Sequence, residues 1–200
     1  MMKYLVAGLI ALLVAGCGHM AMNDDTHAST IPLIWKPTRD FARSGTTDTT
    51  GRAMARLRVE VTDNRTDPAV IGRNSEKIPP RQVTTPDSVA AFVSEHMKQL
   101  IAGNGTTEVD DTGPVILKVE IQQFLVEETE IYNGDIRLKV TLVNSSGTDV
   151  WTGITRGTST RFGRSYSAEN YYEALSDSLV DAVHNLMQSA TFHSALEGTV

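Results

Sequence analysis

Residues 136–142 read Ile-Arg-Leu-Lys-Val-Thr-Leu, the clearest secondary-structure signal in the chain. Apolar and polar residues alternate at every position. Because successive side chains of a β-strand point to opposite faces, this pattern predicts a strand with one buried and one solvated face. The same alternation predicts strands at Arg56–Thr62 and Val115–Gln122. It slips at Gln123-Phe124, which indicates a bulge or the end of the buried pairing.

Turn residues separate the later strands. Asn133-Gly134 is the strongest hairpin signal in the chain, because a type I′ turn needs positive φ at both of its central residues. Asn144–Gly147 predicts a second turn, which leads into a strand from about Val150 to Thr160. The three strands in this part of the chain are therefore predicted to form a meander.

Two stretches with apolar residues at helical spacing are available to cover the sheet. The first begins at Thr85-Pro86-Asp87, where a capping hydroxyl, a proline and an acid precede the periodic run, and it ends at Gly103 and Gly105. The second begins after Ser167, which serves as its cap. The apolar positions of the two predicted helices are Val89, Phe92, Val93, Met97, Leu100 and Ile101, and Tyr172, Leu175, Leu179, Val183 and Leu186.

The predicted element order is β-α-β-β-β-α. It indicates an α+β fold in a single domain over residues 56–200: a two-layer sandwich with a mixed or mostly antiparallel sheet and both amphipathic helices on one face. The connection through the first helix makes the first strand parallel to a neighbour in the same sheet, with a right-handed crossover.

Composition narrows the class of protein. Hydrophobic residues make up 40% of the chain and charged residues 21%, values that exclude chain-wide disorder and a polytopic membrane protein. The net charge of −6 argues against a nucleic-acid partner, which attracts basic proteins. The single cysteine excludes an internal disulfide framework and a zinc site built on cysteines.

The N-terminus has the features of an export signal. Lys3 supplies a positive charge, and Tyr4–Val14 is an apolar run, shorter than the about 20 residues that a transmembrane helix needs. Val14-Ala15-Gly16-Cys17 then resembles the lipobox of bacterial lipoproteins, with the only cysteine of the chain at the position that receives lipid. The alternative is an ordinary secretory signal with a chance cysteine.

The lipobox resemblance implies a location in the cell envelope. Residues 1–16 would be removed as a signal peptide, and the acyl chains on Cys17, palmitate among them, would anchor the protein stably in a membrane. Gly18 stands where lipoproteins of the inner membrane typically carry Asp, so we expect the outer membrane, with the domain facing the periplasm.

Residues 17–55 lack periodicity and are predicted to be a polar tether with a span of roughly 35 Å. Within this tether, Ile31–Trp35 is too apolar for a free linker. It is interpreted as an edge strand of the domain or, less favoured, as a segment on the membrane surface.

Several features together resemble the YajG-type family of bacterial lipoproteins over most of the mature chain. They are the lipobox, the strand that leads into Asp63-Asn64-Arg65 and on to Ile71-Gly72, the amphipathic helix, the three-strand meander and the closing helix. More distantly, the layout is similar to the N-terminal domain of the translocation protein TolB and to auxiliary lipoproteins of envelope transport systems. The resemblance implies an envelope lipoprotein and names no catalytic residues.

Sequence motifs for catalysis are missing. The chain contains no Gly-x-Ser-x-Gly elbow, Ser-x-x-Lys, His-Glu-x-x-His or phosphate-binding loop. His19 and His27 fall in the predicted tether, His96 and His184 fall on different helices, and Asp110-Asp111 is typical of a loop. We therefore expect no enzymatic activity, no cofactor and no metal site.

Two stretches are candidates for contact with a partner. Asp63 and Arg65 follow a strand, where they either form a local turn, the favoured interpretation, or face a partner. The stretch 152–167 is basic within an acidic protein, and we interpret it either as an edge strand kept soluble by charge or as a partner surface. Its candidate residues are Arg156, Arg161, Phe162 and Arg164.

The function expected first is that of an outer-membrane lipoprotein whose non-catalytic domain binds or assists an envelope partner, a protein or a glycan. The second is a periplasmic carrier of a lipid or glycan fragment, and the third is a hydrolase with an unrecognised site. A carrier requires an apolar cavity of about 300–1,000 Å³ between helices and sheet, whereas the core of a binding module is filled.

Overall fold

The computed structural model describes residues 29–40, 55–105, 107–163 and 167–199. The predicted signal peptide, the lipobox residues Val14 to Cys17, and Arg164 lie outside these ranges. The elements are β1 (Ser29–Thr30), β2 (Ala55–Asp63), β3 (Val70–Asn74), β4 (Arg81–Thr84), α1 (Val89–Gly103), β5 (Thr107–Val109), β6 (Val115–Glu128), β7 (Tyr132–Val143), β8 (Asp149–Arg161), α2 (Ala168–Met187) and α3 (Ala190–Glu197).

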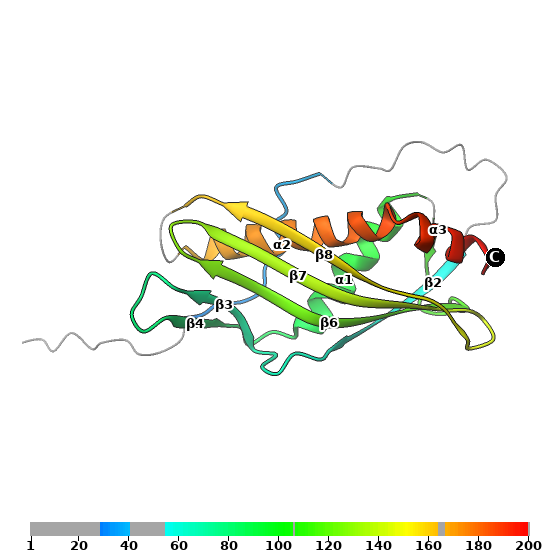
Figure 1. The fold of residues 1–200 in the computed structure, drawn as a ribbon, viewed down its shortest axis with the longest axis horizontal. Coiled ribbons are helices and arrows are strands. Elements are labelled where there is room, and N and C mark those ends of the chain that lie inside the picture. Colours follow the sequence, from blue (N-terminus) through cyan, green and yellow to red (C-terminus); the bar gives the residue numbers. More distant parts are fainter. Residues whose placement is uncertain (1–28, 41–54, 106, 164–166, 200) are drawn as a thin grey trace, which may run out of the picture.

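Strand β6 is the centre of a mixed sheet (Figure 1). One of its edges pairs with β7 in antiparallel fashion, and the other pairs in parallel with β2 through residues 115–121 and with β3 through residues 126–128. The register with β7 shifts between Ile121 and Gln123, which confirms the predicted bulge. Strand β5 lies outside β2, β4 and β1 lie outside β3, and β8 lies outside β7.

Helices α1 and α2 contact each other and the sheet, α1 mainly through β2 and α2 through β7 and β8. The strand positions that alternate toward the helices are apolar and almost wholly buried, and they form one core with the apolar stripes of the helices. Examples from the sheet are Leu57, Leu117, Val119, Leu138 and Val140.

A mixed α/β fold with amphipathic helices against a large sheet is confirmed, but the predicted element order was too simple. Strands β1, β3, β4 and β5 and helix α3 were missed. The missed strands have two to five residues each, which is too short for an alternating pattern to stand out from the neighbouring loops.

The predicted turn at Asn133-Gly134 is wrong. Both residues lie inside β7, and the chain turns at residues 129–131 instead. The close approach of α2 to the sheet accounts for Gly134, because a Cβ there would lie 2.3 Å from Ser178 Oγ and 2.7 Å from the carbonyl oxygen of Ala174. A glycine that indicated a turn in the sequence therefore makes room for a helix.

Small residues let α2 lie directly on β8 as well. A Cβ at Gly157 would lie 2.2 Å from the backbone nitrogen of Ala182. Hydroxyl groups of the strand then bond to carbonyls of the helix: Ser159 Oγ donates to Ala174 at 2.7 Å, and Thr155 Oγ1 donates to Ala182 at 2.6 Å. These buried hydrogen bonds fix the position of α2 along the strand.

Candidate functional site

Residues 31–40, which we call the strap, run from β1 across the helices (blue in Figure 1). The strap begins on the sheet, where the Ile31 N–H donates to the Thr84 carbonyl at 2.9 Å. It then leaves the sheet, and the Trp35 ring stacks on His96 of α1 with 4.1 Å between ring centroids. The edge strand predicted at Ile31–Trp35 is therefore wrong in position: the strand is β1 at Ser29–Thr30, and Ile31 adds one backbone hydrogen bond to the sheet before the strap leaves it. The described part of the predicted tether is packed on the domain.

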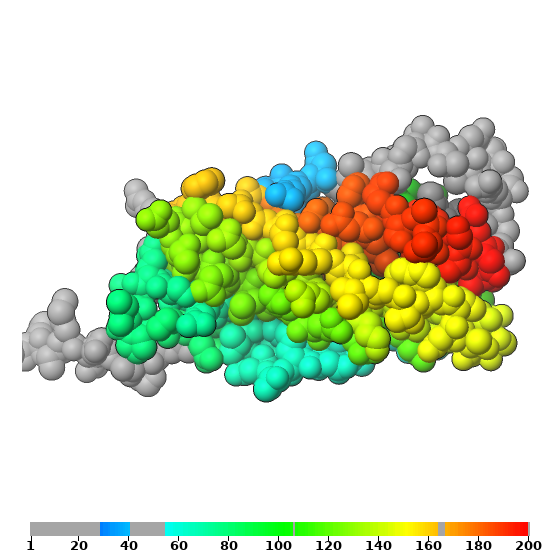
Figure 2. Space-filling model, viewed as in Figure 1, coloured from blue at the N-terminus to red at the C-terminus, as the bar shows by residue number. Residues whose placement is uncertain are grey.

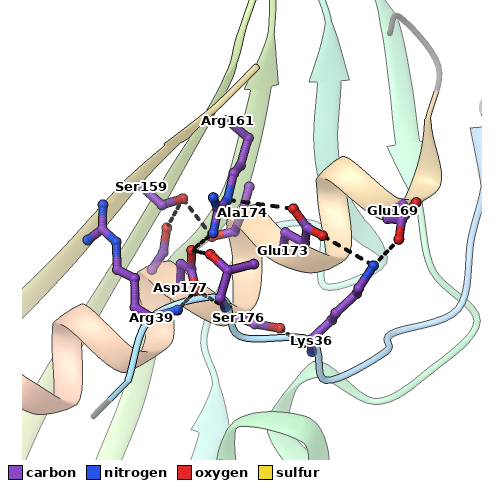
Figure 3. A network of polar contacts seen from close by, with 11 residues as sticks. Lys36, Arg39, Ser159, Arg161, Glu169, Glu173, Ala174, Ser176 and Asp177 are labelled. Atoms are coloured by element: carbon purple, nitrogen blue, oxygen red, sulfur yellow. Dashed lines mark hydrogen bonds and ion pairs between the residues drawn. The ribbon is translucent and has the colours of Figure 1, made fainter. Parts of the chain in front are cut away.

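Asp177 of α2 holds the strap (Figure 3). The residue is fully buried, and its Oδ1 accepts the backbone N–H of Thr38 at 2.7 Å and that of Arg39 at 3.1 Å. Its Oδ2 accepts the Thr38 hydroxyl at 2.8 Å and is ion-paired with Arg161. Burial by itself would raise the pKa of Asp177, but the hydrogen bonds from Thr38, Arg161 and Arg39 outweigh it, and the pKa lies below its ordinary value.

Two further contacts of Lys36, one to a buried hydroxyl and one to surface carboxylates, flank this buried group. The Lys36 N–H donates to Ser176 Oγ at 2.9 Å, and Lys36 Nζ lies between Glu169 and Glu173. The side chains of Lys36 and Glu169 are 41% and 62% exposed, so solvent screens their attraction. The buried carboxylate, rather than the surface pairs, fixes the strap.

The predicted basic surface is divided between two environments. The Arg161 side chain is only 24% exposed and serves the Asp177 network. Arg156 lies on the other face of β8, where its Nε and Nη2 donate to the two carboxylate oxygens of Asp135, both at 2.8 Å. Phe162 is 82% exposed. Only Arg156 and Phe162 of the described candidates in this stretch are open to a partner.

Asp63 and Arg65 form a closed local unit. Arg65 Nε and Nη2 donate to the Asp63 carboxylate at 2.9 and 2.7 Å, and Nη1 donates to the carbonyls of Val70 and Phe124 at 2.6 and 3.1 Å. Their side chains are 11% and 8% exposed. The structure supports the local-turn interpretation, because these charged groups are turned to each other and to the backbone.

The face of the sheet opposite α1 and α2 carries alternating charged and polar residues. Arg58 pairs with Glu60, and Lys139 Nζ lies 2.9 Å from Glu120 Oε1. Figure 2 views this face, where residues of β6 to β8 (green to yellow) form the surface. Apolar exceptions on this face are Ile154 and Val150 of β8, 65% and 40% exposed.

A hollow of about 420 Å³ lies over β6, β7 and β8 at one end of this face. Asp135 is central to it: in addition to Arg156, Gln123 Nε2 donates to its Oδ2 at 2.8 Å. The lining offers amides and hydroxyls, which donate and accept hydrogen bonds, and carboxylates, which accept them. Its other polar members include Glu127, Asn133, Thr158 and Thr160.

A second buried carboxylate, Glu128, lies at the same end of the sheet on the helix side. It is 1% exposed, and it accepts the hydroxyls of Tyr132 at 2.8 Å and Tyr171 at 2.6 Å. Burial is the main cause that raises the pKa of Tyr171 well above its ordinary value, and the hydrogen bond to the Glu128 carboxylate is the second cause. The cavity beside this cluster measures about 160 Å³, less than a lipid or glycan carrier needs.

Sequence reasoning missed the roles of Asp177 and Glu128, and it singled out Ile31–Trp35 of the strap as an edge strand. The only available signal for Asp177 was an acid between the apolar positions Leu175 and Leu179 of the predicted helix, a position that a solvated residue can also occupy. Within the described ranges, no group of three or more His, Cys, Asp or Glu side chains is placed to hold a metal ion. No helix in these ranges is both long and apolar enough to cross a membrane.

Comparison with known proteins gives a family and a fold. A family model described as uncharacterized lipoprotein matches residues 45–197, and no curated protein matches the chain. The protein XCC0632 from Xanthomonas campestris has a similar fold, with a TM-score of 0.56 at 9% identity over 87% of this chain and 100% of that one.

Two further structures are less similar. The PelC dodecamer from Paraburkholderia phytofirmans gives a TM-score of 0.43 at 11% identity, covering 73% of this chain and 90% of that one. Lipoprotein GNA1162 from Neisseria meningitidis gives 0.28 at 18% identity, covering 53% and 83%. The family match spans most of the chain, including every element from β2 to α3, and the chain therefore belongs to this family of uncharacterized lipoproteins.

Proposed function

We propose that the protein is a lipoprotein of the outer membrane, anchored through Cys17 after removal of residues 1–16, whose periplasmic domain is a non-catalytic binding module. Membership of a lipoprotein family supports the anchor, as does the lipobox at Val14–Cys17. The finer resemblance to YajG-type lipoproteins belongs to the same proposal, as do the outer membrane and the periplasmic orientation.

The observation that carries the binding role is the contrast between the two faces of the sheet. The helix side is filled: Leu117, Ile121, Ile136 and Leu138 are all 0% exposed. The opposite face presents polar groups and a hollow of about 420 Å³ around Asp135. A filled core with an accessible polar surface suits recognition of an envelope partner at that surface.

The other two functions find less support. A carrier would need a cavity of about 300 Å³ or more between helices and sheet, and the cavity beside Glu128 is about half that volume. A hydrolase would need an acid or base within reach of substrate. The buried carboxylates of Glu128 and Asp177 are both engaged by the chain's own donors.

Site-specific photocrosslinking in intact cells tests the proposal. A photoreactive residue at Thr158, exposed at the hollow, should form an adduct, whereas the same residue at Glu95, exposed on α1, should not. Asp135→Lys, which reverses the charge at the centre of the hollow, should abolish the Thr158 adduct. Equal adducts from both positions, or a Thr158 adduct that survives Asp135→Lys, would contradict a working surface on this face.

A further inference from the structure

At one end of the sheet, five neighbouring strands each contribute one residue to a row of register partners. Register pairs link Arg161 of β8 to Tyr132 of β7, Tyr132 to Glu128 of β6, Glu128 to Asn74 of β3, and Asn74 to Arg81 of β4. Strands β3, β6 and β8 end at this row. The residues that follow them therefore project beyond one end of the domain.

The two most exposed large apolar side chains of the described residues lie just beyond this row. Ile78, in the connection between β3 and β4, is 98% exposed, and it is followed by Pro79 and Pro80. Phe162, directly after β8, is 82% exposed. Ile78 and Phe162 follow strands at opposite sides of this row, so one flat surface laid across the end of the sheet would contact both side chains.

The chain also enters the fold from this end. Strand β1 runs parallel to β4, and β4 begins in the row, at Arg81. Cys17 precedes Ser29, the first residue of β1, by twelve positions (29 − 17). At about 3.5 Å per extended residue, those positions span at most about 42 Å. A lipid on Cys17 therefore limits the distance of β1 from the membrane to about 42 Å.

We propose that this end of the domain docks on the bilayer surface beside the lipid anchor, with Ile78 and Phe162 as its apolar contacts. The inference rests on the anchor at Cys17 proposed above. Amphipathic surfaces bind the interface by placing apolar groups among the lipid headgroups. The strands then run away from the membrane along the long axis of the domain (Figure 1), which leaves the polar face of the sheet free at its side.

Charge plays a smaller part in this docking. The β3–β4 hairpin carries Arg73, Lys77 and Arg81 against one acid, Glu76. Glu130, in the turn between β6 and β7, adds a second acid at the same end. Because these charges nearly cancel, the apolar side chains carry the contact, and it is expected to form on zwitterionic as well as anionic lipid.

The test uses the mature lipidated protein in liposomes of phosphatidylethanolamine and phosphatidylglycerol. Since Cys17 is acylated, Ile78→Cys supplies the one free thiol for an environment-sensitive fluorophore. The matched control is Ser145→Cys, exposed in the β7–β8 turn at the opposite end of the sheet. The label at position 78 should shift to shorter wavelength and be shielded from iodide at least threefold more than the label at 145. Equal quenching at the two positions would overturn the docking.

Further arms separate this inference from the anchor itself. If the wild-type protein fails to float with the liposomes, the anchor is refuted. If it floats but iodide quenches the label at position 78 as strongly as the label at position 145, only the docking is refuted. Phe162→Cys should report the same shielding as Ile78→Cys, and Ile78→Asp in that background should reduce it. The docking should also form on zwitterionic liposomes of phosphatidylcholine. If the labels are shielded only on liposomes that contain the anionic phosphatidylglycerol, the assignment to apolar contacts is overturned.

Discussion

The backbone N–H of Thr38 donates to the buried carboxylate of Asp177 at 2.7 Å, although 139 positions separate the two residues in the chain. The contact joins the strap, which the sequence predicted to be part of a polar linker, to the buried side of helix α2. Residues 29–40 are therefore packed on the domain, although the sequence predicted that they belong to a polar tether.

Asp177→Asn should destabilise the protein strongly. Asparagine keeps the size of the side chain but removes the charge that faces Arg161 and the strap N–H groups. Breaking a buried ion pair costs about 3–5 kcal/mol of unfolding free energy. Urea denaturation measures it, with Glu169→Gln on the exposed Lys36 pair as the control that should change little. Similar stabilities for the two variants would show that the strap is held elsewhere.

The same carboxylate should make stability depend on acid pH. The pKa of Asp177 is lower in the folded protein than in the unfolded chain, so its contribution is present above the unfolded pKa of about 3.9 and is lost as pH falls through the folded pKa. Wild type should lose stability below about pH 4, and Asp177→Asn should lose less over the same range.

Urea midpoints from pH 7 down to pH 2 measure this difference. Asp110, whose pKa is lowered to about 2 by the Thr112 N–H and by Arg56, titrates in both proteins and cancels in the comparison. Parallel curves for wild type and Asp177→Asn would mean that Asp177 has no shifted pKa.

Gly157→Ala should disrupt the packing of α2 on the sheet. The added Cβ would lie 2.0 Å from the Ser178 carbonyl oxygen and 2.2 Å from the Ala182 nitrogen, backbone atoms that cannot rotate away. We expect a loss of about 3 kcal/mol or more, at the upper end for overpacking. Gly103→Ala in α1, where nothing lies within 4 Å of the new Cβ, should be neutral or stabilising. Thermal melts of both variants check the pair.

Arg161→Gln and Arg156→Gln should differ in their effect on stability, although both residues belong to the same basic stretch of the sequence. Arg161 is ion-paired with the buried Asp177, so its loss leaves that carboxylate without its counter-ion and should cost about 3 kcal/mol or more. Arg156 is 55% exposed on the polar face, and its replacement should leave the Tm unchanged. A fall in Tm for Arg156→Gln equal to that of Arg161→Gln would contradict this division.

The sequence by itself determined the long strands and both major helices. The patterns that predicted them are local, because each depends only on which face of one element is buried. They are the alternation through Ile136–Leu142 and Val115–Gln122, and the apolar stripes of the helices after Thr85 and Ser167. The slip at Gln123-Phe124 predicted the bulge for the same reason. The chemistry of Val14–Cys17 and the single cysteine pointed to the lipoprotein family that the comparison supports.

Only the tertiary structure decided which polar residues are structural and which are exposed. Asp177 and Glu169 are both acids of one helix, yet one is fully buried under the strap and the other lies in solvent. Gly134 looked like a turn residue until α2 was placed against it. The physical reason is the same in each case: burial, pairing and close approach depend on elements far apart in sequence, and no local pattern records which of them will meet.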